Sequence, residues 1–505
     1  MYGQGHPGLL TNATGLRNRA PWLRPGPMAD LSPGTVERIA RLAADIGAED
    51  PRLGDVSAFG AGVRQGIGTG PTVWFGDTAE IPLMAKNPAI RFDYRLGWLA
   101  RNDDIVVIGG PHCPAFEGYQ RRWLNAPGLR YLNVDPETAA ARRATPAVCL
   151  RDAAAFDRLC QALAGQDNAT LHAHITTGTI WALAARLNRA TGATIHVAGP
   201  PPLLSRRAND KIWFGDVAQR LLGPRAIPPK RAAYSASALT RHVAALARDW
   251  DRLVVKVPDS AGSAGNFIVE AKDIVDLAPA ALNRRLVRDL SINGRPPVFP
   301  MLVEVWDANV LTSPSVQTWI PGPQDGPPVI EALFEQVLHG EHAAFAGAVP
   351  ADLPPPVEAE LIRGAVRLAT LFQQLGYFGR CSFDALVTGP NGAAGTVHWI
   401  ECNARWGGVS VHMSLVHRLS QGGDPPPYAI VQNDSDRVPE LDFEDALREF
   451  ADAAPPPDLG SGVLFLSPGL METGTGCHFL AFGPDRGAAT ELARATVRRL
   501  QGAGP

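Results

Sequence analysis

Three polar side chains of different chemistry stand at alternate positions in one short stretch near the end of the chain. Residues 400–408 read IECNARWGG, so Glu401, Asn403 and Arg405 are spaced two residues apart. In an extended strand, alternate side chains point to the same face, and all three would share one side. That face is either a polar surface turned to solvent or a site that binds charged groups.

The segment before this stretch predicts a β-hairpin that adds a second carboxylate to the same face. If the turn lies within GPNGAAG, residues 389–395, the register sets Asp384 across from Glu401. Facing side chains of an antiparallel pair come within about 5 Å at Cβ, and two carboxylates there repel each other unless a cation lies between them. With the Asn403 amide oxygen they form a set of hard oxygen ligands that suits Mg²⁺. A polar, solvent-facing strand side is the alternative.

A second candidate site follows a strand that ends in a lysine. RLVVKVPDSAGSAGNFIVE, residues 252–270, reads as a strand with Lys256 near its end, a loop of small residues and another strand. Such a loop can lay backbone N–H groups against phosphate oxygens without obstruction by side chains. The segment is not GxxxxGK[ST] and no helix follows, which argues against a P-loop. An ordinary hairpin with an exposed lysine is the alternative.

A third candidate is Lys211, at the start of the predicted helix KIWFGDVAQRLLG. Either Asn209 or Asp210 caps this helix, which stops at Gly223. A surface lysine in the first helical turn is the alternative for Lys211.

A carboxylate also interrupts the apolar strand PMLVEVWDANV, residues 300–310. Glu304 lies within this strand, and Asp307 and Asn309 follow it. A charged group in such a strand often marks a ligand position, whereas an edge strand is the alternative.

The elements that must position these residues begin with an alternating α/β pattern. Short apolar runs with helical segments between them predict a layered α/β domain with buried parallel strands. The strands are expected at 72–76, 104–110, 130–135, 171–175 and 194–199. The Gly- and Pro-rich residues 1–70 look partly irregular. GAGVRQGIGTG at 60–70 resembles a dinucleotide fingerprint, but no strand precedes it and no helical pattern follows, which argues against an NAD site.

The second half of the chain predicts a mixture of strands, hairpins and helices. The proline-rich segment 199–210 marks a boundary, and a loop at 350–356 leads into a long helix at 357–376. A further strand is predicted at 315–320, and the tail at 456–505 gives two strands and a final helix. His172 and His174 share a strand face, but without a third ligand a structural role is favoured over a metal pair.

Composition limits the class of protein. The chain has 505 residues, of which 45% are hydrophobic and 19% charged, which is typical of a folded protein of two to four domains. A net charge of -3 and a pI near 6.5 give no electrostatic case for nucleic acid or acidic membranes. Six scattered cysteines indicate neither a zinc site nor a disulfide framework. Without a signal peptide or an apolar span, a cytoplasmic location is expected.

Taken in order along residues 200–415, the candidate residues resemble the ATP-grasp superfamily. The resemblance implies that two lysines contact ATP, that the small-residue loop closes over its phosphates, and that a hinge strand holds adenine and ribose. It also implies that an acid on one strand and an E-x-N motif on the next bind two Mg²⁺ ions, with Mn²⁺ as an alternative, while an Arg beyond them assists phosphoryl transfer. The matching residues are Lys211 and Lys256 for ATP, Ser260, Gly262, Ser263 and Gly265 for the loop, Glu304 with Asp307 or Asn309 for the hinge, Asp384, Glu401 and Asn403 for the metal, and Arg405 and Lys256 for catalysis.

A narrower likeness rests on NDKIWF, VKVPDSAGSAGN, SPSVQTWIPG and the C-terminal tail. Together with the N-terminal α/β region they are similar to the pheganomycin-type peptide ligases. The implied fold class is α/β and α+β, with a Rossmann-like pre-ATP-grasp domain, an ATP-grasp fold and a short C-terminal α/β extension. The predicted units are an irregular segment at 1–70, the pre-ATP-grasp domain at 71–205, a small lid subdomain at 206–310, a large metal-binding subdomain at 311–430 and the extension at 431–505.

The activity that the resemblance implies is ATP-dependent ligation of a carboxylate to an amine through an acyl phosphate, releasing ADP. The substrates would be a small-molecule or peptide acid and amine, and the resemblance also implies a homodimer. Arg380, four residues before Asp384, is a candidate for binding the substrate carboxylate, and a structural ion pair is the alternative. A small-molecule kinase and a non-catalytic ATP-binding module are the rival functions. The full metal and arginine set argues against the non-catalytic module.

Overall fold

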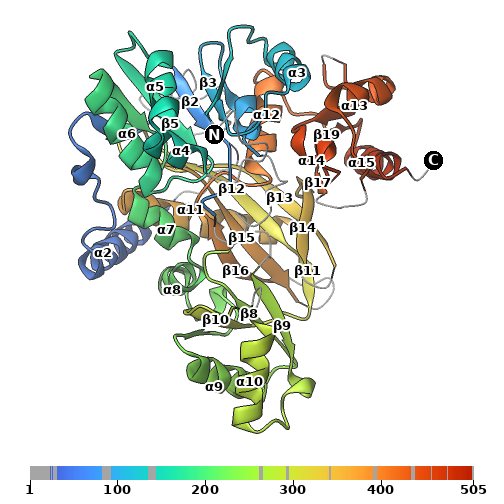
Figure 1. Ribbon diagram of the computed structural model, residues 1–505. Helices are drawn as coiled ribbons and strands as arrows, with labels where there is room; N and C mark the ends of the chain where they lie inside the picture. Colours follow the sequence, from blue (N-terminus) through green and yellow to red (C-terminus); the bar gives the residue numbers. More distant parts are fainter. Residues whose placement is uncertain are drawn as a thin grey trace, which may run out of the picture.

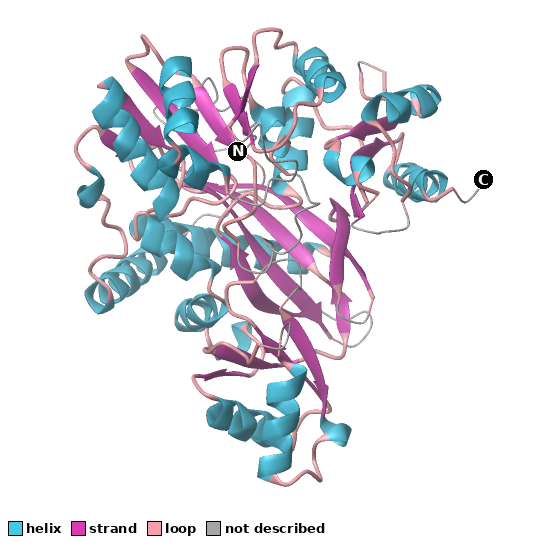
Figure 2. Ribbon diagram, in the orientation of Figure 1, coloured by secondary structure: helices cyan, strands magenta, loops and turns pink. Residues whose placement is uncertain are grey.

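The computed structural model describes residues 23, 26, 31–81, 92–134, 144–260, 265–291, 295–340, 343–389, 395–433, 438–456, 458–474 and 476–502. Within them the chain forms one parallel and two antiparallel sheets, each with its own helices (Figures 1 and 2). The mixed α/β fold class predicted from the sequence is confirmed.

The first sheet is parallel and has the order β1-β6-β5-β2-β3-β4. Its strands are buried runs of apolar residues because helices cover the sheet. The strands are β1 Val63–Gln65, β2 Thr72–Phe75, β3 Ile105–Ile108, β4 Arg130–Asn133, β5 Asn168–Ala173 and β6 Thr194–Val197. The helices are α3 Pro114–Leu124, α4 Thr145–Arg151, α5 Ala153–Ala162 and α6 Gly178–Thr191, with the 3₁₀ turn η3 at Arg95–Leu99. All five strands expected between residues 72 and 199 are present.

The prediction that residues 1–70 form an irregular segment is wrong for residues 33–49, 57–59 and 63–65, which form regular elements. Helix α2 spans Pro33–Glu49 and is capped by the Ser32 hydroxyl. Its apolar residues Ile39, Ala43 and Ile46 lie on one face and pack in the core that contains the long helix described below. After it come the turn η1 Ser57–Phe59 and the edge strand β1, which pairs with β6. This part of the chain is therefore built into two of the three sheet units.

The second sheet is small, antiparallel and ordered β7-β10-β8-β9. It comprises β7 Lys230–Ala233, β8 Arg252–Lys256, β9 Asn266–Glu270 and β10 Met301–Val305. Helices α9 Ala236–Leu246 and α10 Pro279–Asp289 bury one face of the sheet in a separate apolar core. We call this unit the lid; it projects from the rest of the molecule at the bottom of Figure 1.

The third sheet has nine strands, all paired antiparallel, in the order β11-β15-β12-β13-β14-β17-β19-β18, and β16 pairs with β15. Its strands are β11 Val310–Thr312, β12 Pro314–Ile320, β13 Val329–His339, β14 Ala344–Pro350, β15 Gly379–Thr388, β16 Thr396–Asn403, β17 Tyr428–Asn433, β18 Gly462–Phe465 and β19 Cys477–Phe482. The helices that accompany it are α7 Pro202–Asn209, α8 Lys211–Leu222, α11 Pro355–Gln374, α12 Ser410–Leu419, α13 Phe443–Glu449, α14 Gly469–Glu472 and α15 Arg486–Leu500.

Two features of this sheet bear on the domain boundaries expected from the sequence. Helix α8, expected within the lid, packs with α11 in the core of the large sheet. The tail strands β18 and β19 continue the same sheet through β17, which straddles the expected boundary at residue 430. The tail and large subdomain thus share one sheet.

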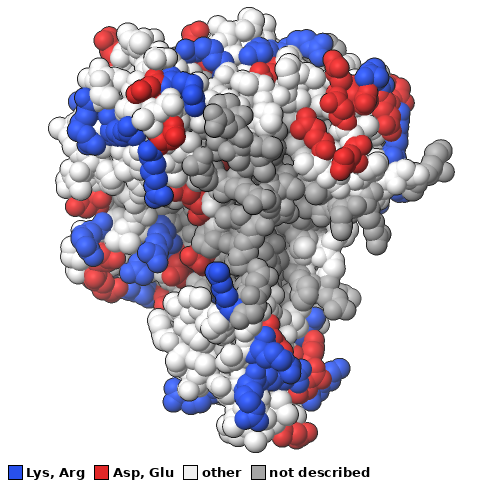
Figure 3. Space-filling view, viewed as in Figure 1, with Lys and Arg blue, Asp and Glu red and all other residues white. Residues whose placement is uncertain are grey.

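Charged side chains of both signs are interspersed over the face shown in Figure 3, with Asp and Glu more frequent over the C-terminal helices. Among the described residues, no helix combines the length and the apolar character needed to cross a membrane.

Candidate functional site

The β15–β16 hairpin has the register expected from its turn signals. Asp384 pairs with Glu401, and Ser382 pairs with Asn403. The alternate residues Cys402 and Ala404 are buried in the core formed with α8 and α11, which turns Glu401 and Asn403 to the other face of the strand. Glu401 and Asn403 therefore share a polar face because Cys402 and Ala404, which alternate with them, are buried on the opposite side of the strand.

The side chains on this face contact one another directly. Asn403 Nδ2 donates to Asp384 Oδ2 at 2.9 Å and to Glu401 Oε1 at 3.4 Å. The Ser315 hydroxyl on β12 donates to Asp384 Oδ1 at 2.6 Å. The three predicted metal ligands, Asp384, Glu401 and Asn403, thus lie together, while Ser315 is a partner that the sequence did not reveal.

The two carboxylates differ in their electrostatic surroundings. Burial, followed by the charge of Glu401, raises the pKa of Asp384 to about 7. Burial also opposes ionisation of Glu401, but the nearby Lys211 ammonium and then Arg405 hold its pKa below the usual value. Crowded carboxylates of this kind are stabilised by an added cation.

Lys211 links the polar face to the lid. Its Nζ lies 2.8 Å from Glu401 Oε2 and donates to the backbone carbonyl of Ser260 at 2.8 Å. The Asp210 side chain caps α8 by accepting from the backbone N–H groups of Ile212 and Trp213, which resolves the choice of cap left open by the sequence. Helix α8 thereby fixes the buried Lys211 between the lid and β16.

The polar face of the lid sheet gathers two lysines around Glu304. Lys256 forms a buried ion pair with Glu304, and Lys230 is the direct register partner of Glu304 on β7. Lys230 Nζ also lies 3.3 Å from Asp216, and burial lowers its pKa. Sequence reasoning did not include Lys230 among the candidate site residues. The available signal was that lysine is rare in this chain, which has only five.

The small-residue loop is described only at its two ends. The Ser260 hydroxyl donates to the Val257 carbonyl at 2.9 Å, and the Val257 N–H donates to the Gly265 carbonyl at 3.0 Å. A Cβ on Gly265 would lie 2.6 Å from the Ser260 hydroxyl oxygen, so a side chain at position 265 would collide with Ser260. Gly262 and Ser263 lie outside the described residues.

Arg405 is positioned by an asparagine that precedes α8. Its guanidinium donates to the side-chain oxygen of Asn209, and the same oxygen accepts from the Ala404 N–H at 3.1 Å. Asn209 in turn donates to the Ser205 carbonyl at 2.8 Å. The sequence suggested Asn209 only as a helix cap, whereas here it holds the end of β16 and the side chain of Arg405.

The two candidates for a ribose contact have different surroundings. The side chain of Asp307 lies 2.8 Å from His398 Nδ1 on β16. Asn309 accepts from the Gly389 N–H through its backbone carbonyl at 3.1 Å. The choice between Asp307 and Asn309 stays a prediction.

Arg380 occupies a buried position near the start of β15, on the same strand face as Asp384 but four residues before it. It forms an ion pair with Glu331, and both side chains are almost fully buried. The guanidinium also lies 4.8 Å from the ring centroid of Trp406 and 3.2 Å from the Ser414 hydroxyl. Of the two roles expected for Arg380, this geometry supports the structural ion pair.

We expect Arg380→Met to destabilise the fold by about 3 kcal/mol, because it leaves the Glu331 carboxylate buried without its ion-pair partner. Urea denaturation measures the loss, and Arg380→Met combined with Glu331→Leu should recover much of it. As a control, Arg448→Met removes an exposed pair with Asp445 and should cost less than about 1 kcal/mol. If stability is unchanged while the KM for an acid substrate rises, Arg380 binds that substrate instead.

The histidine pair on β5 supports the structure around the site. The indole N–H of Trp406 donates to His172 Nε2 at 2.9 Å, and the Trp406 backbone N–H donates to the His174 carbonyl at 2.9 Å. Burial lowers the pKa of His172 to about 3. These contacts dock the carboxyl end of the parallel sheet onto the segment that follows Arg405, in agreement with the structural role expected for the histidines.

The polar face of the hairpin fits a hard divalent cation. Among the described residues, no three His, Cys, Asp or Glu side chains form a metal-binding group. The ligand set is instead two facing carboxylates and an amide, which suits Mg²⁺ because this ion usually keeps several water or phosphate ligands. The raised pKa of Asp384 agrees with this fit, since a bound cation would offset both of its main causes, burial of the carboxyl group and the negative charge of Glu401.

The metal-free protein should lose stability as the pH rises between the ordinary pKa of Asp384 and its raised pKa in the fold. The pKa of Asp384 is about 7 in the folded protein and ordinarily 3.8, so between these pH values the folded state binds more protons than the unfolded state. The contribution of Asp384 to the free energy of unfolding then falls by up to about 1.4 kcal/mol per pH unit. Urea denaturation in EDTA should show this slope as the difference between wild type and Asp384→Asn. Equal slopes in the two proteins would contradict the prediction.

Comparison with known proteins identifies the architecture. Residues 93–188 match the Pre ATP-grasp domain. No curated protein matches the chain in sequence. The solved ADP complex of purK, N5-carboxyaminoimidazole ribonucleotide synthetase, aligns with 15% identity and a TM-score of 0.51, covering 80% of this chain and 98% of that chain.

Two further solved structures align with slightly lower TM-scores. N5-carboxyaminoimidazole synthetase from Staphylococcus aureus shares 10% identity and a TM-score of 0.49, covering 86% of this chain and 99% of that chain. The biotin carboxylase domain of Hydrogenobacter thermophilus 2-oxoglutarate carboxylase shares 13% identity and a TM-score of 0.49, covering 85% and 89% respectively. At such identities the comparison concerns the fold, which is a pre-ATP-grasp domain followed by an ATP-grasp fold.

Proposed function

We propose that this protein is an ATP-dependent carboxylate–amine ligase that forms an amide through an acyl phosphate and releases ADP. The observation that carries the proposal is the meeting of Asp384, Glu401 and Asn403 on one hairpin face, with Lys211 and Arg405 beside them. Such a set can hold a metal–nucleotide complex and place a guanidinium at its reactive end. The purK structure, which has a similar fold, was solved as an ADP complex.

The lid supplies the groups expected to bind the nucleotide. The polar face of its sheet carries Lys230, Lys256 and Glu304, and its loop begins at Ser260, next to Lys211. A phosphate group would compete with Glu304 for Lys256, which then offsets phosphate charge. Asp307 or Asn309, at the hinge between the lid and the large sheet, would contact ribose.

We expect two Mg²⁺ ions to bind at Asp384, Glu401 and Asn403, and Mn²⁺ is the alternative metal. Bound there, the metal would neutralise phosphate charge during transfer. The Asn403 side chain would turn its amide oxygen toward the ion.

The protein contributes mainly position and charge to the reaction. A substrate carboxylate attacks the γ-phosphorus of ATP, and Arg405 holds the transferring oxygens with its planar fork. An amine then attacks the acyl carbon and displaces phosphate, leaving an amide. Asn209 keeps the guanidinium of Arg405 aimed while both steps proceed.

The substrates are proposed to be amino acids or peptides, as in the pheganomycin-type ligases that the motifs resemble. The carboxyl edge of the parallel sheet, docked against Trp406, would provide part of their pocket. A cytoplasmic location, where ATP is present, and a homodimer complete the proposal.

A screen of amino acids and short peptides, supplied in pairs with ATP and Mg²⁺, tests the function. Mass spectrometry follows the organic product, and coupled assays follow ADP and phosphate. A ligase releases ADP and phosphate together with an amide only when acid and amine are both present. A product that retains phosphate would establish a kinase, and nucleotide binding without turnover of any pair would favour a binding module.

A further inference from the structure

A histidine and a buried glutamate form a pair at the start of α3, outside the ATP-grasp residues. His112 Nδ1 lies 2.7 Å from Glu117 Oε1. The His112 side chain is 46% exposed, whereas that of Glu117 is 8% exposed. A carboxylate at Nδ1 favours the tautomer with its proton on that nitrogen, so the accessible Nε2 is left as a proton acceptor.

Several contacts hold the carboxylate of Glu117 in place. The Tyr94 hydroxyl donates to Glu117 Oε1 at 3.0 Å and accepts from the Cys113 N–H at 2.9 Å. Arg121, one turn along the helix, lies 3.8 Å from Glu117 Oε2. Glu117 also stands in the first turn of α3, where the helix dipole favours a negative charge. The buried carboxylate of Glu117 therefore fixes the orientation of the His112 ring.

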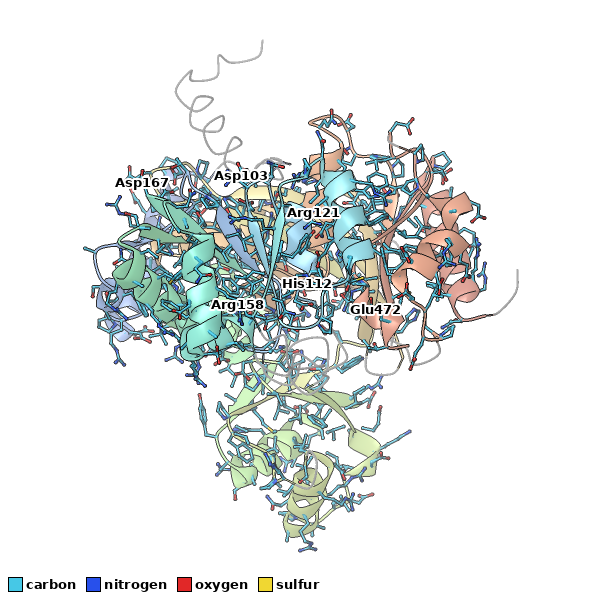
Figure 4. The ribbon with its side chains drawn as sticks, turned by 45° about the horizontal axis from the view of Figure 1, so that its top comes forward. Asp103, His112, Arg121, Arg158, Asp167 and Glu472 are labelled. Carbon is cyan, nitrogen blue, oxygen red and sulfur yellow. The ribbon has the colours of Figure 1, made fainter. Side chains whose placement is uncertain are left out.

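The pair lies on the side of the parallel sheet that faces the proposed active site. Figure 4 shows Asp103 and Asp167, which precede β3 and β5, at the far side of the sheet, and His112, which follows β3, on the side toward the lid. On the same edge, the His174 carbonyl at the end of β5 accepts from Trp406, the residue after Arg405. Only β2 separates β3 from β5, which places their ends about 10 Å apart along this edge.

We propose that His112 is the general base that prepares the amine substrate of the ligation, with Glu117 as its positioning residue. The inference rests on the proposed function and adds a named role to it. His112 Nε2 takes one proton from the substrate ammonium. The freed lone pair of the amine attacks the acyl carbon, the bond from that carbon to the phosphate oxygen breaks, and phosphate leaves with the electron pair and the second amine proton.

Other charged groups also lie near His112. On helix α3, which follows His112, these are Glu117 and Arg121. From the C-terminal unit, Glu472 on α14 contacts the adjacent Cys113, and Asp442 lies near the same thiol. Figure 4 shows Glu472 beside His112 on the side toward the lid. Carboxylates outnumber cations among these groups, which suits the binding of an incoming ammonium group.

The test separates the two half-reactions by the choice of nucleophile. The twenty amino acids serve as acids, and either hydroxylamine, uncharged at pH 7, or L-alanine amide, mostly an ammonium ion at that pH, serves as the nucleophile. We expect His112→Asn to lower amide formation with alanine amide by about 10²-fold at pH 7 and to leave hydroxamate formation near wild type. Raising the pH to 9 should restore part of the amide rate, because the free amine is then abundant.

Two further variants make the test decisive. His242→Asn, on the lid helix α9, is the control and should leave both rates unchanged. Glu117→Gln removes the carboxylate that orients the His112 ring, so it should lower amide formation with alanine amide more than hydroxamate formation, and circular dichroism checks that it folds. Equal loss of both products, or an unchanged amide rate at pH 7 in His112→Asn, would overturn the role of His112. A wild-type protein that makes neither product would instead refute the proposed ligase function.

Discussion

Replacement of Arg405 by alanine is expected to lower the rate of ADP formation by about 10³-fold or more, as for an arginine that stabilises the transferring phosphoryl group. Arg405 extends the alternation of β16 beyond Glu401 and Asn403, and Asn209 fixes its guanidinium. Because its proposed role is to hold the transferring oxygens, loss of Arg405 should affect turnover more than nucleotide binding. Single-turnover measurements with saturating ATP separate the two effects.

Arg405→Lys provides the graded comparison. It keeps the charge but loses the planar fork, so its rate should lie between those of wild type and Arg405→Ala. Arg220→Ala, which removes an exposed pair with Glu49, is the control and should retain wild-type turnover. Turnover near wild type in Arg405→Ala would remove Arg405 from the catalytic role.

The sequence was most informative where local pattern determines structure. In the hairpin, turn residues fixed the pairing of Asp384 with Glu401, and strand alternation fixed the shared face of Glu401 and Asn403. The Lys256 strand, the helix that begins at Lys211 and the parallel strands of the first domain were also predictable from apolar runs and caps. Each of these features depends on residues close together in the chain.

The features that sequence reasoning missed depend on long-range packing. Asn209 accepts a hydrogen bond from Arg405, although the two are almost two hundred residues apart in the sequence. Lys230 lies beside Glu304 only because β7 pairs with β10. The role of Arg380 was ambiguous because its partner Glu331 comes from β13, which is not adjacent to β15 in the sheet. No periodicity or spacing in one sequence encodes such pairs.

The misjudged N-terminal segment has a different cause. Gly- and Pro-rich composition suggested an irregular chain, yet Ser32 followed by Pro33 is a helix-start signal and the helix buries Ile39 and Ile46 at helical spacing. The composition of the whole segment outweighed this local pattern. Strand β1 is only three residues long and is stabilised by pairing with β6, so its own sequence carries little signal.

Glu401→Gln should lower ATP turnover by about 10³-fold, because it removes a charged metal ligand and with it several kcal/mol of transition-state stabilisation. It also removes the ion-pair partner of Lys211, which lies 2.8 Å from Glu401 Oε2. We therefore expect a higher Mg²⁺ concentration at half-maximal rate as well as a lower maximal rate. A magnesium titration of ADP formation measures both quantities.

Glu335→Gln is a closely matched control for this change. The side chains of Glu335 and Glu401 are both 23% exposed, and each forms an ion pair, Glu335 with Arg486. Glu335 lies on β13 of the same sheet but outside the proposed ligand set, so its substitution tests the loss of a half-buried charge without the loss of a metal ligand. If the two variants lower turnover equally, or if Glu401→Gln leaves the magnesium dependence unchanged, the hairpin face does not bind the catalytic metal. A large effect confined to Glu401→Gln would place the metal between Asp384 and Glu401, where two carboxylates with opposed pKa shifts already face each other.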